Sequence, residues 1–271
     1  MNATTIIPLP VILCADDFGI SGGVNKAILD LAAKKRISAV SCMSLGVAWE
    51  EGARALKALH GNVSVGLHLT LTYLPPLVKE LGERHPSEQK LLLQSWGRGL
   101  DKTLVEKEIR AQFKKFQDVF QAPPDFIDGH QHVHVLPVIR DILLRVKQEY
   151  APEAWMRNVV DVTALADNHK YGILAVMGWR WLGLLKKNKI PHNKRLRGTY
   201  NYQTPADYAA LMKRWCSLKE PVLIYCHPGF PDGDLAKFDS VLTPRQREYD
   251  FLNGDVFGGW LGQKIRLAGQ P

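Results

Sequence analysis

The chain has 271 residues, of which 46% are hydrophobic and 23% charged, with a formal net charge of +8. This composition is typical of a folded globular protein and excludes a disordered one. No apolar run reaches the about 18 residues that a membrane-spanning helix needs, and the excess positive charge comes without a known nucleic-acid-binding module. We therefore expect one globular domain over residues 1–271 and no nucleic-acid partner.

The cysteine pattern predicts a reduced, cytoplasmic protein. Cys14, Cys42 and Cys226 lie in apolar, strand-like runs, and none of the four cysteines, Cys216 included, forms a CxxC pair. Such cysteines are usually small, buried core residues. The N-terminal segment has no positively charged start and runs from apolar residues into two aspartates, so we interpret it as a first strand and not as a signal peptide.

Strand-like and helix-like segments alternate along the chain. Apolar runs predict strands at 11–19, 37–45, 63–71, from 126 onward, at 155–160 and at 221–227. Apolar residues at helical spacing predict helices at 24–35, 49–59, 103–120, 137–150, 204–218 and 243–252. The stretches at about 73–100 and 161–201 are interpreted as insertions, the second of them irregular. The alternation predicts an α/β fold with a parallel sheet, and about six to seven strands favour an incomplete or distorted (β/α) barrel.

The segment from Asp128 to His134 reads Asp-Gly-His-Gln-His-Val-His and is the most informative in the chain. Side chains at i, i+2 and i+4 share one face of an extended strand, so His130, His132 and His134 are expected to point the same way. Neutral imidazole is a common ligand of transition metals. The pattern therefore indicates a metal site. The alternative is that these are ordinary surface histidines at a solvent-exposed strand end.

Three other predicted strands also carry acids or histidines at or near their C-terminal ends. Asp16 and Asp17 end the first apolar run, His68 lies in the third, and His227 follows the last one. Each has an ordinary alternative explanation, such as a helix cap or a buried core histidine. Because active sites form at the C-terminal ends of parallel strands, the four segments together predict one site.

One carboxylate and two imidazoles make a metal site with open positions, where a bound water ionises near neutral pH. We expect Asp17, His68 and one histidine of the fourth strand to bind the metal, Asp16 to act as the base and His227 to protonate a leaving group. This arrangement fits hydrolysis of an ester or amide. Spacing alone decides neither which histidine of the fourth strand nor which of the two aspartates is a ligand.

Four segments together resemble the YdjC-like (ChbG/HpnK) family of carbohydrate deacetylases. They are ADDFGIS at 15–21, VGLHL at 65–69, DGHQHVH at 128–134 and CHPG at 226–229. A weaker motif, Pro244-Arg245-x-x-Glu248, also fits the family. The order and spacing hold from about residue 11 to residue 253. Cys14 departs from the family, in which many members carry Asn at that position.

The resemblance implies a (β/α) barrel-like fold, one divalent metal ion and removal of the N-acetyl group from an amino sugar. Carried over position by position, it implies Asp17, His68 and His130 as metal ligands, Asp16 as general base and His227 as the acid or a substrate contact.

Three further residues are expected to contact the substrate. They are His132, Arg157 and Arg245; Arg157 follows the fifth predicted strand, where the family usually has an Arg, and could instead orient a carboxylate or form a surface salt bridge. The metal is expected to be Mg or Zn, with Co or Mn as further choices, and a homodimer is plausible.

The resemblance leaves the substrate open between a chito-oligosaccharide and the amino-sugar headgroup of a lipid, because residues 161–201 match nothing in the family. Within them, Trp179, Trp181, Leu182, Leu184 and Leu185 lie beside lysines and form either a surface for peripheral membrane contact or a barrel-wall helix. The rival functions are a metal-dependent phosphoesterase or other hydrolase, and a sugar- or lipid-binding protein with a structural metal.

Overall fold

The computed structural model describes residues 8–97, 99–164, 170–202, 207–239 and 242–271. In chain order, its helices, 3-10 turns (η) and strands are β1 (Leu9–Phe18), α1 (Gly22–Ala33), β2 (Ala39–Cys42), α2 (Trp49–Lys57), β3 (Ser64–Leu69), η1 (Lys79–Leu81), α3 (Glu88–Trp96), α4 (Lys102–Phe120), β4 (Phe126–Gly129), η2 (His130–Val135), α5 (Ile139–Tyr150), β5 (Trp155–Met156), η3 (Val162–Ala164), α6 (Lys170–Lys187), β6 (Arg195–Arg197), α7 (Tyr208–Trp215), β7 (Val222–Cys226), α8 (Leu235–Phe238), α9 (Thr243–Asn253), α10 (Asp255–Trp260) and β8 (Ile265–Leu267).

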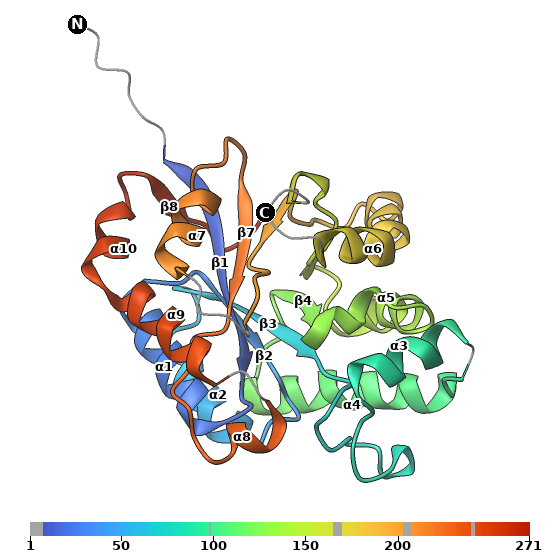
Figure 1. The fold of residues 1–271 in the computed structure, drawn as a ribbon. Coiled ribbons are helices and arrows are strands. Elements are labelled where there is room, and N and C mark those ends of the chain that lie inside the picture. The colour runs from blue at the N-terminus through green and yellow to red at the C-terminus, as the bar shows by residue number, and fades with distance from the viewer. Residues whose placement is uncertain (1–7, 98, 165–169, 203–206, 240–241) are drawn as a thin grey trace, which may run out of the picture.

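A parallel sheet lies at the centre of the fold, with helices around it (Figure 1). Its strand order is β5-β4-β3-β2-β1-β7-β6, and the short β8 pairs with the start of β1. The sheet curls into a half-barrel, which confirms the expected incomplete (β/α) barrel. The central strand β1 is buried from Val11 to its end, as its continuous apolar run predicts.

The two ends of the curled sheet approach each other through loop contacts. The backbone N–H of Asn158, after β5, donates to Oδ1 of Asn193, before β6, at 2.9 Å. The Nδ2 of Asn193 donates back to the Asn158 carbonyl, also at 2.9 Å, and the Met156 N–H donates to the Pro191 carbonyl at 3.0 Å. Paired amides thus hold together the described segments after β5 and before β6, and they fix where Arg157 emerges.

The expectation of an irregular segment at 161–201 is wrong, because α6 and β6 lie within it. Trp181 and Leu185 of α6 are fully buried, so they belong to the barrel wall and not to a membrane-facing surface, whereas Trp179 is 68% exposed. The insertion at 73–100 likewise contains the helix α3. The first residues of the helix expected at 204–218, 204–206, lie outside the described residues.

In the described ranges, we find no helix whose length and apolarity together would suffice to span a membrane. All four cysteines are free thiols, and Cys14, Cys42 and Cys226 are buried, as the sequence predicts.

Candidate active site

A cavity of about 460 Å³ lies at the C-terminal ends of the strands. Its lining includes seven of the eight residues that the sequence nominates, namely Asp16, Asp17, His68, His130, His132, His227 and Arg245. The eighth, Arg157, is fully buried and contacts the site from beneath the lining. The tertiary structure therefore brings together segments that lie more than 200 residues apart in the chain.

A bulge in β1 turns two adjacent aspartates toward one cavity. The register of β1 against β2 shifts between Ala15 and Phe18, and Asp17 has a left-handed φ of 68°. In a regular strand the two side chains would face opposite sides of the sheet. Neither carboxylate caps α1, because Ser21 holds that position and accepts a hydrogen bond from the Val24 N–H. Both carboxylates are therefore available to the site.

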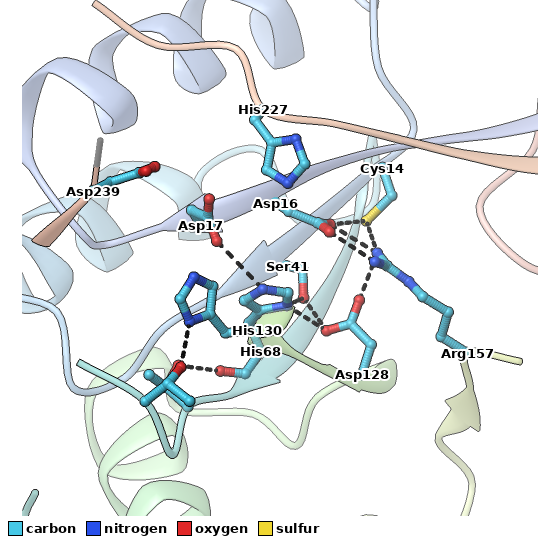
Figure 2. Close-up of polar contacts among 12 residues, drawn as sticks. Cys14, Asp16, Asp17, Ser41, His68, Asp128, His130, Arg157, His227 and Asp239 are labelled. Carbon is cyan, nitrogen blue, oxygen red and sulfur yellow. Dashed lines mark hydrogen bonds and ion pairs between the residues drawn. The ribbon is translucent and has the colours of Figure 1, made fainter. Parts of the chain in front are cut away.

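Asp16 is held by a two-pronged ion pair with Arg157 (Figure 2). Nη1 and Nη2 of Arg157 donate to the two oxygens of Asp16, each at 2.7 Å, and Nη2 also lies 2.5 Å from Oδ2 of Asp128. Burial by itself lowers the pKa of Arg157, but the carboxylates of Asp128 and Asp16 outweigh burial and raise it well above its ordinary value. Arg157 is thus a permanent cation that aligns two carboxylates.

His68 lies between two carboxylates. Its Nδ1 is 2.6 Å from Oδ1 of Asp128 and 2.9 Å from Oγ of Ser41, and its Nε2 is 3.3 Å from Oδ1 of Asp17. Burial alone would lower the pKa of His68, but Asp128 and Asp17 raise it to about 10 in the absence of metal. A carboxylate behind Nδ1 fixes the ring and directs Nε2 into the cavity, which is the usual support of a metal-binding histidine.

Asp17 is held from its other side by Arg245 of α9. Nη2 of Arg245 donates to Oδ2 of Asp17 at 2.5 Å and also pairs with Oδ2 of Asp239. Burial works to raise the pKa of Asp17, but Arg245 and His68 hold it well below its usual range. Asp17 is therefore ionised, with its Oδ1 directed toward the histidines.

The histidine segment departs from the expected geometry. The strand β4 ends at Gly129, and His130 to Val135 form the 3-10 turn η2, in which Gln131 and His132 both have left-handed backbones. The expectation that the three histidines share one strand face is therefore wrong. The side chains separate because the left-handed backbones of Gln131 and His132 turn the chain, so alternate residues no longer face one side.

The three histidines consequently have different surroundings. Nδ1 of His130 lies 2.9 Å from Oγ1 of Thr72, and burial lowers the pKa of His130 to about 4. His132 lines the cavity beside Tyr225. His134 is fully buried and its Nε2 hydrogen-bonds to the Arg157 carbonyl at 3.1 Å, so it serves the fold. Of the three, His130 has its ring in edge-on contact with His68, with centroids 5.9 Å apart.

The donor set formed by Asp17, His68 and His130 fits a divalent metal ion. Oδ1 of Asp17 is buried, and its contact with Nε2 of His68, at 3.3 Å, falls short of hydrogen-bond geometry in the described part of the chain. A buried, ionised carboxylate oxygen with so weak a partner favours a bound cation beside it. If Nδ1 of His130 donates to Oγ1 of Thr72, 2.9 Å away, the lone pair of that ring lies on Nε2, as a metal ligand requires. One carboxylate and two imidazoles leave further coordination positions open.

A second cluster of possible metal ligands, formed by Cys14, Asp16 and Asp128, already surrounds a cation. Nη2 of Arg157 lies 3.2 Å from Sγ of Cys14, 2.7 Å from Asp16 and 2.5 Å from Asp128. Burial raises the pKa of the Cys14 thiol well above its usual value, so it is protonated. The guanidinium therefore takes the place that a metal would need, and this cluster is the support of Asp16.

His227 leaves β7 and faces the cavity from the opposite side of the two aspartates to His68 and His130 (Figure 2). Its backbone N–H donates to Oε2 of Glu248 at 2.5 Å, and its Nδ1 lies 3.2 Å from Oη of Tyr202. The second oxygen of Glu248 accepts a hydrogen bond from Oη of Tyr200 at 2.6 Å. Helix α9 therefore supports both sides of the site, through Arg245 and Glu248, which are three residues apart on one helix face.

Sequence reasoning missed several residues that complete the site, namely Ser41, Thr72, Asp128, Asp239, Tyr202, Tyr225 and Glu248. Asp128 had a signal, because it is the last acid before the histidine turn on a strand that ends in the site. Glu248 also had a signal, because it belongs to the motif Pro244-Arg245-x-x-Glu248. The others lie in segments without a distinctive pattern, and only the packing of the barrel brings them into contact with the functional residues.

Comparison with known proteins supports this description. The model of the YdjC-like protein family matches residues 10–263. Proteins named chitooligosaccharide deacetylase from Yersinia pestis and Yersinia pseudotuberculosis are 34% identical over 142 residues, which is 51% of this chain and 56% of each relative. The match thus spans about half the length of these relatives. A crystal structure from Enterococcus faecalis, described as a cellobiose-phosphate cleavage protein, has the same fold, with a TM-score of 0.74, 20% identity and 97% of each chain covered.

Proposed function

The chain belongs to the YdjC-like family, and on that basis we propose that it is a metal-dependent deacetylase that removes the N-acetyl group from an amino sugar. The observation that carries the proposal is that the adjacent carboxylates of Asp16 and Asp17 have different partners. Oδ1 of Asp17 faces the histidines and lies 3.3 Å from Nε2 of His68, whereas Asp16 is held by Arg157 outside that ligand set. A hydrolase with one metal and one general base needs this separation.

In the proposed reaction, Asp17, His68 and His130 hold the metal ion. When bound, a divalent metal lowers the pKa of water and polarises the carbonyl of the amide. The role of the chain is to keep Asp17 ionised and to orient the two histidine rings. Arg245 keeps Asp17 ionised, Asp128 orients His68, and Thr72 orients His130.

Asp16 accepts the proton of the attacking water. Its carboxylate is fixed by two hydrogen bonds from one guanidinium, so the base is already oriented before the reaction begins. Because Arg157 is anchored to both Asp16 and Asp128, the base and the support of His68 share one rigid element.

His227 donates a proton to the nitrogen of the leaving amino sugar. Its position across the aspartates from His68 and His130 supports a role for His227 away from the proposed metal ligands (Figure 2). The cavity of about 460 Å³ can accommodate one or two sugar rings. Its tyrosines, Tyr202 and Tyr225, provide the mixed apolar and hydrogen-bonding surface that carbohydrates need.

The direct test is acetate release from N-acetylated chito-oligosaccharides by chelator-treated protein, with and without added Mg, Zn, Co or Mn. We expect release that depends on the added metal and is absent in Asp17→Asn. Acetate release at full rate in the chelated protein would refute the metal dependence. Absence of release from chito-oligosaccharides and from an N-acetylglucosamine-bearing glycolipid, with every metal, would refute the deacetylase activity.

A further inference from the structure

His227 has an unusual support for a proton-donating histidine. In the described part of the chain, its ring has one hydrogen-bond partner, Oη of Tyr202, at 3.2 Å from Nδ1. Glu248, the carboxylate that contacts His227, accepts hydrogen bonds at both oxygens, one from the His227 backbone N–H and the other from Tyr200. The ring is therefore oriented by a phenol and not by an acid.

The geometry around Tyr202 determines which atom donates. Oη of Tyr202 also lies 3.4 Å from the carbonyl oxygen of Gly198, which can only accept a hydrogen bond. If the phenol donates to Gly198, its oxygen is free to accept a hydrogen bond from the Nδ1–H group of His227, and both hydrogen bonds form. If it donates to Nδ1 instead, the Gly198 carbonyl loses this donor. The first arrangement makes one more hydrogen bond in a buried site.

The acceptor at Gly198 is fixed by the backbone. Gly198 has a φ of +128°, and a Cβ there would lie 2.3 Å from the carbonyl oxygen of Tyr225. Only glycine fits so close to β7 in this conformation. The ring of His227 is held in turn by edge-on contacts with Tyr202 and Tyr225, each with centroids 5.6 Å apart. The loop, the phenol and the imidazole thus form one rigid chain.

We propose that Tyr202 is a positioning residue that keeps a proton on Nδ1 of His227, so that Nε2 is the atom that gains and loses the catalytic proton. This inference rests on the proposed function in one respect only, the role of His227 as the acid. Burial raises the pKa of Tyr202 well above its ordinary value, so the phenol keeps its proton and continues to donate to Gly198. In the proposed cycle the doubly protonated ring gives its Nε2 proton to the leaving group and keeps the proton on Nδ1.

The tautomer can be measured without any substrate. In the full-length, metal-free protein labelled with ¹⁵N-histidine, the resonances of His227 are assigned by their loss in His227→Gln. We expect neutral His227 to have a protonated Nδ1 and a bare Nε2. In Tyr202→Phe we expect the tautomer that free imidazole prefers, with the proton on Nε2. Tyr200→Phe, the matched control, removes a hydroxyl that bonds Glu248 and not the ring, and should keep the Nδ1 tautomer.

Kinetics provide the second readout. We expect Tyr202→Phe to lower kcat about tenfold with little change in KM, because general acid catalysis contributes about 10²-fold or more and its orientation is only partly lost. A bare Nδ1 in the wild type, or an unchanged tautomer and kcat in Tyr202→Phe, would overturn the proposal. If the wild type releases no acetate, the proposed function fails, whereas the wild-type tautomer still decides the role of Tyr202.

Discussion

Arg157 and Asp16 form a fully buried, two-pronged ion pair, with both nitrogen–oxygen distances at 2.7 Å. The pair joins residues 141 positions apart in the chain. Its second partner, Asp128, supports His68, so one guanidinium couples the proposed base to the proposed metal site.

Arg157→Lys should therefore disable catalysis more than metal binding. An ammonium cannot donate two parallel hydrogen bonds to Asp16, and a misplaced base costs about 100-fold in rate. We expect kcat to fall by about that factor while calorimetry shows metal binding within a few-fold of the wild type. Arg110→Lys is the matched control, because Arg110 makes a similar fork to Glu149 and Glu106 at the surface. Equal losses in both variants would contradict this role for Arg157.

The two adjacent aspartates should separate by function. Asp17→Asn removes a charged metal ligand and should abolish stoichiometric metal binding, as should His130→Ala. Asp16→Asn should keep the metal and lose turnover by about 10²–10⁴-fold, the usual contribution of a general base. Metal content after gel filtration and acetate release distinguish these outcomes. An active Asp16→Asn variant would remove the base assignment.

Asp128→Asn should weaken metal binding without removing a ligand. Its carboxylate lies 2.6 Å from Nδ1 of His68, and loss of such a partner typically costs about 10–100-fold in metal affinity. Asp125→Asn is the control, because Asp125 precedes the same strand at its opposite end and accepts the Val65 N–H. Titration with a competing chelator measures both affinities. The prediction fails if the two variants bind metal equally well.

Acid should destabilise the protein through its buried histidines. Burial lowers the pKa of His134 to about 3, so it is neutral in the folded state and protonates first in the unfolded chain, near pH 6.5. Because the pKa of His134 is lowered on folding, its contribution to the free energy of unfolding is retained above pH 6.5 and lost as the pH falls toward 3. Between pH 7 and pH 5, the free energy of unfolding falls by about 2 kcal/mol through this residue.

Urea unfolding at pH 7 and pH 5 measures this dependence. His68 has the opposite effect on the free energy of unfolding. Its pKa is raised to about 10, so its stabilising contribution is fully present below pH 6.5 and is lost as the pH rises through 10. Comparison of variants isolates one residue. His134→Gln should have a smaller difference in the free energy of unfolding between the two pH values than the wild type, and an identical difference would refute the assignment.

Much of the fold was readable from the sequence because its signals are local. The apolar run of β1 and the stripe of α4 reflect burial on one strand and one helix face, and both elements lie where they were expected. The 161–201 stretch was misjudged for the same reason. Its helix α6 is apolar on several faces and bears glycines, so the helical periodicity of its hydrophobic residues is weak. The helix packs against Val159 at Gly178, a tertiary contact that the local pattern does not reveal.

The sequence by itself determined which chemistry-bearing residues exist and that parallel strands carry them to one end of the sheet. Only the tertiary structure decided which of these residues face the cavity together and which ones support them. Three features of the tertiary structure assign these roles. They are the bulge at Asp17, the turn after β4 and the burial of Arg157. No local pattern encodes such contacts, because a carboxylate becomes a ligand or a base only through the charge that is packed beside it.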